Sequence, residues 1–478
     1  MMRKLFLPLL LLTTLSIQAA KQTYDLRLDG IYYRIDGKRA LVAKGDEPYL
    51  GDVVIPDRIE STEGAFDVTG IDAKAFYGSK AMTSVTYPAS ITSIGENAFQ
   101  NCEGLKQFTI SEHITFIAGS AFENAGLEQI VIPASVSNIG DRVFRGCKAL
   151  KSAVILNKSI GEEQFTQCSS LENVTISENV TTIKKKAFAR CTRLSTITIP
   201  QSAVKVENEI FVGCDKLENA VVLNETIAEK QFSGCKMLSQ LTLSEALTMI
   251  DKQAFAGCEK LEAFRTPAKL QIIEDEVFLR CTSLAIVELG NSLTHIGKKA
   301  FAGSLIEQIV IPASVKTFGE GAFQNCKNLK RLELHNAMIS ESEFQGCIAL
   351  SEIVFEAVPF RIAKNAFNGC VALTALELPE GVSIVDNNAF HGCKGIERIV
   401  LPASIEQIGS GAFSGCPVLR TIRCLAVQVP AAAANAFSGI AKDGLRIEVP
   451  AESVEPYKLA AGWKALQPKE GQVFFPIE

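Results

Sequence analysis

The sequence predicts a curved α/β solenoid of about 17 coils, each 21–24 residues long. We expect one long parallel β-sheet on its concave face, with short strands and helical turns elsewhere. Two observations lead to this prediction: a short motif recurs in phase along most of the chain, and each copy holds an alternating apolar segment of strand length. A solenoid is a single body at any length, so the 478 residues need not divide into several globular domains.

The repeat is marked most clearly by phenylalanine. Of the 27 Phe residues, 17 follow one another at intervals of 21 to 24 residues. These anchors are Phe76, Phe99, Phe122, Phe144, Phe165, Phe188, Phe211, Phe232, Phe255, Phe278, Phe301, Phe323, Phe344, Phe367, Phe390, Phe413 and Phe437. A coiled coil would instead need a period of seven, so the anchors indicate a stacked coil of about two dozen residues.

Each repeat begins with a short strand. After Phe99, the residues Leu105, Phe108 and Ile110 follow L-x-x-L-x-L spacing, and alternation points Phe108 and Ile110 inwards. In several copies a proline follows the strand and ends it, because proline has no N–H for the ladder. A second extended piece (91–94) and a short helical turn (96–101) complete the unit. One such coil has no second layer, so a core forms only when coils stack.

The chain ends differ from the repeats and suggest four segments. Residues 1–20 have a signal peptide's charged start (Arg3, Lys4), apolar centre and small-residue end, with cleavage expected near Ala19 or Ala20. Residues 21–52 alternate around Asp36-Gly37 and predict an N-terminal β-hairpin cap. The solenoid would then span 53–440. A C-terminal cap would span 441–478, where 451–466 have the pattern of a short amphipathic helix.

Cysteine usage points to the core. Of the 14 cysteines, 13 lie three residues after an anchor Phe, and Cys424 takes an inward strand position. Side chains stacked in parallel disfavour the torsion near 90° that a disulfide needs. We therefore expect reduced, buried thiols that behave as small hydrophobic groups.

The residue content gives no basis for catalytic, cofactor or metal-binding residues. The four His residues are scattered, no C-x₂-C pair occurs, and the glycines recur with the coil instead of forming a phosphate loop. A net charge of -5 argues against a nucleic-acid partner. After residue 20 no stretch is long and apolar enough for a transmembrane segment. We expect a non-enzymatic monomer that is secreted, on the cell surface or in the periplasm.

The outward face of the sheet carries the candidate partner-binding residues. Its strand positions are uncharged up to the Phe232 coil, whereas half of them are charged from the Phe255 coil to the Phe413 coil. The charged set is Arg265, Glu288, Arg331, Glu333, Glu352, Glu377, Arg398 and Arg423. Our hypothesis is a mixed-charge strip that binds a protein. An alternative is that these charges only protect the sheet from nonspecific association.

The repeated string AFHGCKGIERIVLPASIEQIGSGAF (389–413) resembles the BspA-like, Treponema-type leucine-rich repeats, whose pattern is approximately A-F-x-G-C-x-x-L-x-x-I-x-I-P-x-S-V-x-x-I-G. The resemblance covers about 380 residues and implies a leucine-rich-repeat solenoid. It also implies a secreted or surface bacterial protein, because some members of the family act as adhesins.

These inferences combine into one expected function. We expect a protein-binding or adhesion module whose partner is an extracellular or bacterial-surface protein. The alternative is a structural envelope protein, or a glycan-binding helper without a specific host protein partner. No aromatic residue occupies the outward strand positions, which makes a sugar ligand the weaker choice.

Overall fold

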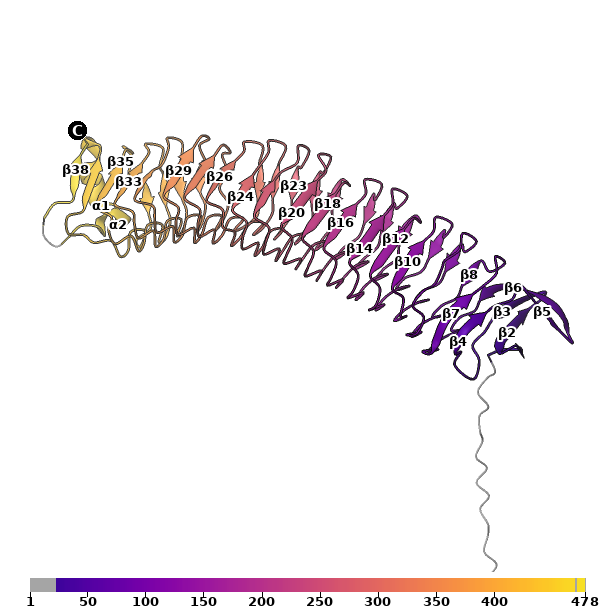
Figure 1. The fold of residues 1–478 in the computed structure, drawn as a ribbon. Coiled ribbons are helices and arrows are strands. Elements are labelled where there is room, and N and C mark those ends of the chain that lie inside the picture. The colour runs from indigo at the N-terminus through magenta and orange to yellow at the C-terminus, as the bar shows by residue number, and fades with distance from the viewer. Residues whose placement is uncertain (1–22, 469–470, 478) are drawn as a thin grey trace, which may run out of the picture.

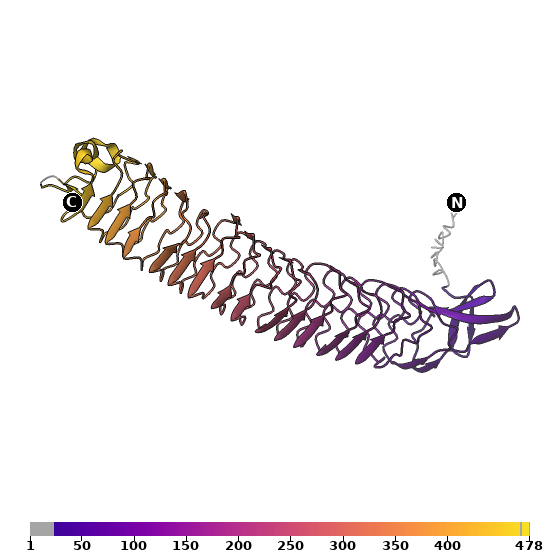
Figure 2. The same cartoon turned by 90° about the horizontal axis from the view of Figure 1, so that it is seen from above.

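The computed structural model describes residues 23–468 and 471–477, which form one long, gently curved rod (Figure 1). The expected signal peptide lies outside the described residues. Coils stack from the N-terminal end to the C-terminal end, and the main strands form a row along one side (Figure 2). The solenoid predicted from the phenylalanine spacing is confirmed.

The row of main strands contains one short strand from almost every coil. In order they are β4 (Gly51–Val54), β7 (Met82–Thr86), β10 (Gln129–Ile132), β12 (Ser152–Ile155), β14 (Asn173–Ile176), β16 (Thr196–Ile199), β18 (Asn219–Val222), β20 (Gln240–Leu243), β22 (Ala263–Arg265), β24 (Ile286–Glu288), β26 (Gln308–Ile311), β28 (Arg331–Leu334), β29 (Glu352–Phe355), β31 (Ala375–Glu377), β33 (Arg398–Leu401), β35 (Thr421–Cys424), β37 (Arg446–Val449) and β38 (Phe474–Pro476). Every pairing among them is parallel.

A second row of two-residue strands runs along another side of the rod. It comprises β8 (Ser93–Ile94), β9 (Phe116–Ile117), β11 (Asn138–Ile139), β13 (Ser159–Ile160), β15 (Thr182–Ile183), β17 (Lys205–Val206), β19 (Thr226–Ile227), β21 (Met249–Ile250), β23 (Ile272–Ile273), β25 (His295–Ile296), β27 (Thr317–Phe318), β30 (Arg361–Ile362), β32 (Ile384–Val385), β34 (Gln407–Ile408) and β36 (Ala431–Ala432).

The two ends of the rod have their own elements. At the N-terminal end, β1 (Leu26–Leu28), β2 (Ile31–Asp36) and β3 (Arg39–Val42) pair antiparallel in turn, and β5 (Arg58–Ser61) forms a hairpin with β6 (Gly64–Ile71). Strand β6 continues into the second row through β8. At the C-terminal end, η1 (Ala451–Ser453), α1 (Val454–Leu459) and α2 (Ala461–Lys464) lie over the last coil.

The sheet is less continuous than the sequence indicates. The main strands separate into short ladders, three of which are three-stranded: β10-β12-β14, β16-β18-β20 and β26-β28-β29. The middle strand of each belongs to the coil that leads into a 21-residue step. A trimmed coil aligns closely with its neighbours. Its ladder ends at the next longer coils, so register is lost at regular intervals.

The segment expected as a helical turn is instead a chain of hydrogen-bonded turns. Ala98, Gln100 and Cys102 each donate an N–H to a carbonyl three residues earlier. A helix cannot continue there because Asn97 and Asn101 adopt φ of 55° and 62°, in the left-handed region. Alternate N–H groups of this segment also donate to the next coil, so the turns hold neighbouring coils together as the strands do.

The anchor phenylalanines form one buried column. Successive rings from Phe76 to Phe437 stack nearly parallel, with centroid separations of 4.9 to 5.6 Å. The column ends in other aromatic residues: Tyr49 lies 4.7 Å from Phe76, and Trp463 lies 5.3 Å from Phe437. Stacked rings that also bury their full area hold each coil to the next.

All 14 cysteines are buried, as the phase of the repeat predicts, and all are free thiols. Each of the 13 that follow an anchor Phe donates its S–H to the carbonyl of the anchor Phe one coil earlier, as Cys102 does to Phe76 at 3.0 Å. A thiol there fills the space of a small apolar group and supplies a donor to a buried carbonyl.

Candidate functional site

The eight charged residues of the predicted strip lie on main strands between β22 and β35. Within these strands buried and exposed residues alternate, so the charged side chains point away from the core. Because paired strands are parallel and in register, a side chain lies directly beside its equivalent one coil away. Charge and spacing therefore decide which of the eight meet.

The first two residues of the strip form a pair. Arg265 of β22 is the register partner of Glu288 of β24, and Arg265 Nε lies 3.1 Å from Glu288 Oε2. The two side chains are 70% and 59% exposed, so the pair contributes little to stability. Its effect is to fix both side chains along the sheet surface.

Arg331 is the centre of the largest charge cluster on the strip. Its guanidinium forms an ion pair with Glu352 on β29 and another with Glu333 on its own strand, at 3.3 Å. Glu333 Oε1 in turn lies 2.6 Å from His335 Nε2. Hydrogen bonds from His335 and Arg331 hold the pKa of Glu333 below its ordinary value. The residue His335 was not among the predicted site residues, because it lies just past the strand.

The last three residues behave differently from one another. Arg423 pairs with Glu448 of β37 at 3.6 Å, and Arg446 approaches the same carboxylate at 2.7 Å. Among residues 23–468 and 471–477, no ion pair includes Glu377 or Arg398. The register pairs Glu377 with Val400 and Arg398 with Ala375, so these opposite charges are offset and do not face each other.

A hollow in the sheet surface lies beside the Arg331 cluster, at the junction between β24 and β26. These neighbouring strands are not paired in a ladder. The cavity there has a volume of about 340 Å³ and is lined by Glu288, Gln308, Val310, Arg331 and Glu333, among others. A second cavity of about 530 Å³ continues it past Ile286. Ile286 and Val310 are half exposed, so the hollow combines apolar side chains with charges of both signs.

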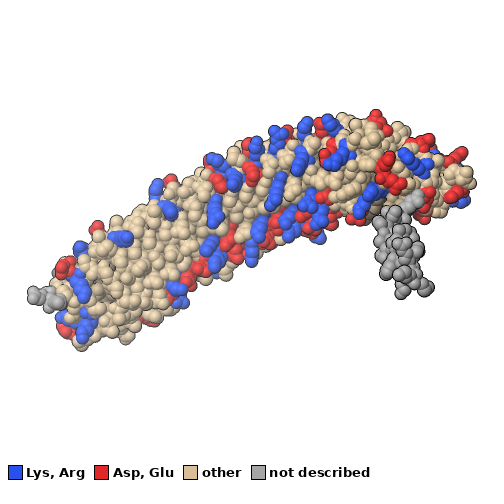
Figure 3. Space-filling view, turned by 90° about the horizontal axis from the view of Figure 1, so that it is seen from below, with Lys and Arg blue, Asp and Glu red and all other residues tan. Residues whose placement is uncertain are grey.

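The charges elsewhere on the rod are also mixed. Figure 3 shows basic and acidic side chains interspersed in rows along the face it displays, with no large region of one sign. In the described part of the chain, no group of three or more His, Cys, Asp or Glu residues is arranged to hold a metal ion. No helix within these residues has the length and apolar character needed to cross a membrane.

Comparisons with known proteins give a family and a fold. The chain matches the family model described as a BspA type leucine rich repeat region, with six copies over residues 69–158, 158–284, 219–330, 248–362 and 337–452. A solved leucine-rich repeat protein from Bacteroides ovatus is 22% identical, with a TM-score of 0.55, and the match covers 89% of this chain and 100% of that chain.

Another similar solved structure is a leucine rich cell surface protein from Faecalibacterium prausnitzii. It is 23% identical with a TM-score of 0.35, over 85% of this chain and 96% of that chain. A search of curated proteins found no match.

Proposed function

Because the chain belongs to the BspA-type leucine-rich repeat family, we propose that it is a non-enzymatic bacterial protein, secreted or on the cell surface, that binds another protein through its exposed sheet face. The charged start and apolar centre of residues 1–20 favour that location. The main support for binding is the hollow at the β24–β26 junction.

The hollow has the composition of a protein-binding surface. Its half-exposed Ile286 and Val310 offer apolar area, and Glu288, Arg331 and Glu333 surround that area with charge. An apolar centre with a polar rim is the usual anatomy of a protein interface. The ion pairs around Arg331 hold its guanidinium in place, so a partner meets an ordered surface and less entropy is lost on binding.

The test is a pull-down with purified protein and two lysine variants. Val310→Lys places a charge in the hollow, whereas Thr198→Lys places the same charge at the equivalent exposed position of β16 in the uncharged half of the sheet. Extracts of host matrix and of bacterial surfaces supply the candidate partners. We expect saturable, salt-sensitive retention of one protein that Val310→Lys abolishes and Thr198→Lys preserves. Retention that neither substitution changes, or retention of polysaccharide alone, would contradict the proposal.

A further inference from the structure

The two ends of the row of main strands are not equivalent. Strand β38 closes the C-terminal end by pairing with β37, and strand β4 begins the row at the N-terminal end by pairing with β7. Each end strand has an outer edge without a ladder partner in the described residues. An unpaired edge exposes N–H and C=O groups that can pair with another extended chain.

The C-terminal edge is blocked. Ile447 donates its N–H to the Val473 carbonyl and Ile477 donates to the Val449 carbonyl, so the backbone groups of Val473 and Ile477 face β37. Those of Phe474 and Pro476 therefore face outwards. Pro476 has no N–H, and the side-chain amide of Gln472 donates to the Phe474 carbonyl at 2.6 Å. This edge has little left to offer a further strand.

The N-terminal edge is open. Ile55 donates its N–H to the Thr86 carbonyl at 2.9 Å, so the N–H groups of Val53 and Ile55 point to β7. By alternation, those of Asp52 and Val54 point to the outer edge. No proline lies within β4, and Leu50 and Val54 are 71% and 68% exposed. An open edge flanked by exposed apolar side chains is the arrangement used in strand addition.

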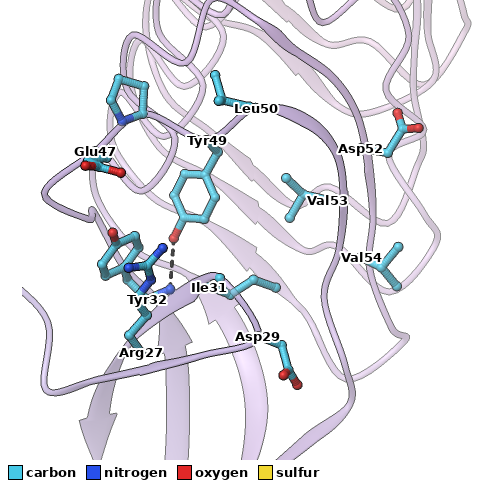
Figure 4. A pocket seen from close by; sticks show the side chains of 12 residues that line it. Arg27, Asp29, Ile31, Tyr32, Glu47, Tyr49, Leu50, Asp52, Val53 and Val54 are labelled. Carbon is cyan, nitrogen blue, oxygen red and sulfur yellow. Dashed lines mark hydrogen bonds between the residues drawn. The ribbon is translucent and has the colours of Figure 1, made fainter.

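A slot lies next to this edge. It has a volume of about 430 Å³ and separates β4 from the turn that joins β1 to β2. Figure 4 shows Tyr49 and Ile31 over the slot, with the Tyr49 hydroxyl accepting a hydrogen bond from the Tyr32 N–H at 3.1 Å. That bond fixes one wall of the slot, because both tyrosines are buried.

The charge around the slot is negative. Asp29, Glu47 and Asp52 line it, against the single cation Arg27, whose guanidinium lies over the Tyr32 ring at 5.0 Å. Hydroxyls of Ser84 and Thr83 bond to the Asp52 carboxylate and lower its pKa, so it is ionised at neutral pH. A second copy of this chain would bring another three carboxylates to the same place, so a basic partner fits better.

We propose that the outer edge of β4 binds an extended, lysine- or arginine-bearing segment of another protein as an added strand. Backbone pairing to Asp52 and Val54 supplies the main recognition, and the three carboxylates select for a basic sequence. This site is at the N-terminal end of the rod and is independent of the hollow between β24 and β26.

The experiment measures binding of a labelled peptide with four Val-Lys repeats by fluorescence anisotropy. Val54→Pro removes the outward N–H without touching a bond to β7, and Val54→Thr keeps it as the matched control. We expect saturable binding to wild type and Val54→Thr, and binding at least about fivefold weaker for Val54→Pro, because one backbone hydrogen bond is lost. A peptide with four Val-Glu repeats should bind far more weakly.

Two further measurements cover the other outcomes. If Val54→Pro does not fold, the same peptide N-methylated at alternate residues removes donors from the ligand instead, and it should lose binding to the wild-type protein. Equal binding of all variants and peptides, or no binding at all, would overturn the proposal. A concentration-dependent dimer in sedimentation that Val54→Pro abolishes would also overturn it, because β4 would then pair with a second copy.

Discussion

A single substitution, Glu343→Gln, should make the protein more stable at neutral pH. Glu343 is fully buried and lies in the third of the shortened coils. Gln164 and Gln231 occupy the equivalent positions of the other two and are also fully buried. All three side chains accept an N–H from the residue three positions earlier, which for Glu343 is Ser340 at 2.7 Å. Glutamine can keep this bond without the charge.

The expected size follows from the pKa. Burial raises the pKa of Glu343 from 4.5 to about 8, and the hydrogen bonds from Ser340 offset only part of that rise. The folded protein therefore holds a proton that the unfolded chain releases between pH 4.5 and 8. Stability falls with rising pH across this window, by about 1.4 kcal/mol per pH unit, or roughly 5 kcal/mol in all. At pH 7 the loss is about 3 kcal/mol.

The assay is urea unfolding followed by circular dichroism at several values between about pH 5 and 9. Glu343→Gln should nearly match wild type at about pH 5 and exceed its free energy of unfolding by about 3 kcal/mol at pH 7. The reciprocal change Gln164→Glu should give a loss with the same pH dependence. If wild type and Glu343→Gln differ by a constant amount over this whole pH range, the reasoning is refuted.

Three further outcomes can be measured on the same protein. Phe255→Ala removes a ring stacked between Phe232 and Phe278 and should lower the free energy of unfolding by about 3–5 kcal/mol in urea, with Phe255→Leu losing less. Thiol reagent should find almost no reactive cysteine in the native protein and 14 after unfolding, since burial raises the pKa of thiols such as Cys102 and Cys214 to about 12. Tyr457→Phe deletes the hydroxyl that donates to the Ala426 carbonyl at 2.8 Å and should lower the free energy of unfolding by about 1 kcal/mol or more in urea.

Much of the core could be predicted because burial repeats with the coil. The phase of Phe and Cys in the sequence is enough to place both columns inside the rod, where the side chains are buried. The aromatic ends were harder to predict. Tyr49 lies 27 residues before Phe76 and outside the repeat interval, so only the folded N-terminal strands show that its ring continues the column.

Backbone pairing was predicted less well, because it depends on register between coils of unequal length. Alternation marks a strand in every coil, but it does not say whether adjacent strands approach closely enough to bond. The separation of β24 from β26, which creates the hollow, has no signature in either strand alone. The left-handed Asn97 and Asn101 could have warned against a helical turn, since asparagine tolerates that conformation best after glycine.

The ion pairs of the strip do have a signature in the spacing, and it leads to a last prediction. Arg265 and Glu288 are 23 residues apart in a 23-residue coil, and Arg331 and Glu352 are 21 apart in a 21-residue coil, so each pair shares one register position. Glu377 and Arg398 are also 21 apart, but their coil from Phe367 to Phe390 has 23 residues, so they are out of register.

Arg398 is therefore free to pair with a bound protein, whereas Arg331 already has partners within the chain. Arg398→Glu should weaken the salt-sensitive association with the captured partner and leave the urea midpoint unchanged. Arg331→Glu places three carboxylates together, so it should lower the midpoint as well. Binding measured at two salt concentrations, beside unfolding of both variants, separates these effects. If Arg398→Glu binds the partner as wild type does at both concentrations, the strip's charges serve only to keep the sheet soluble.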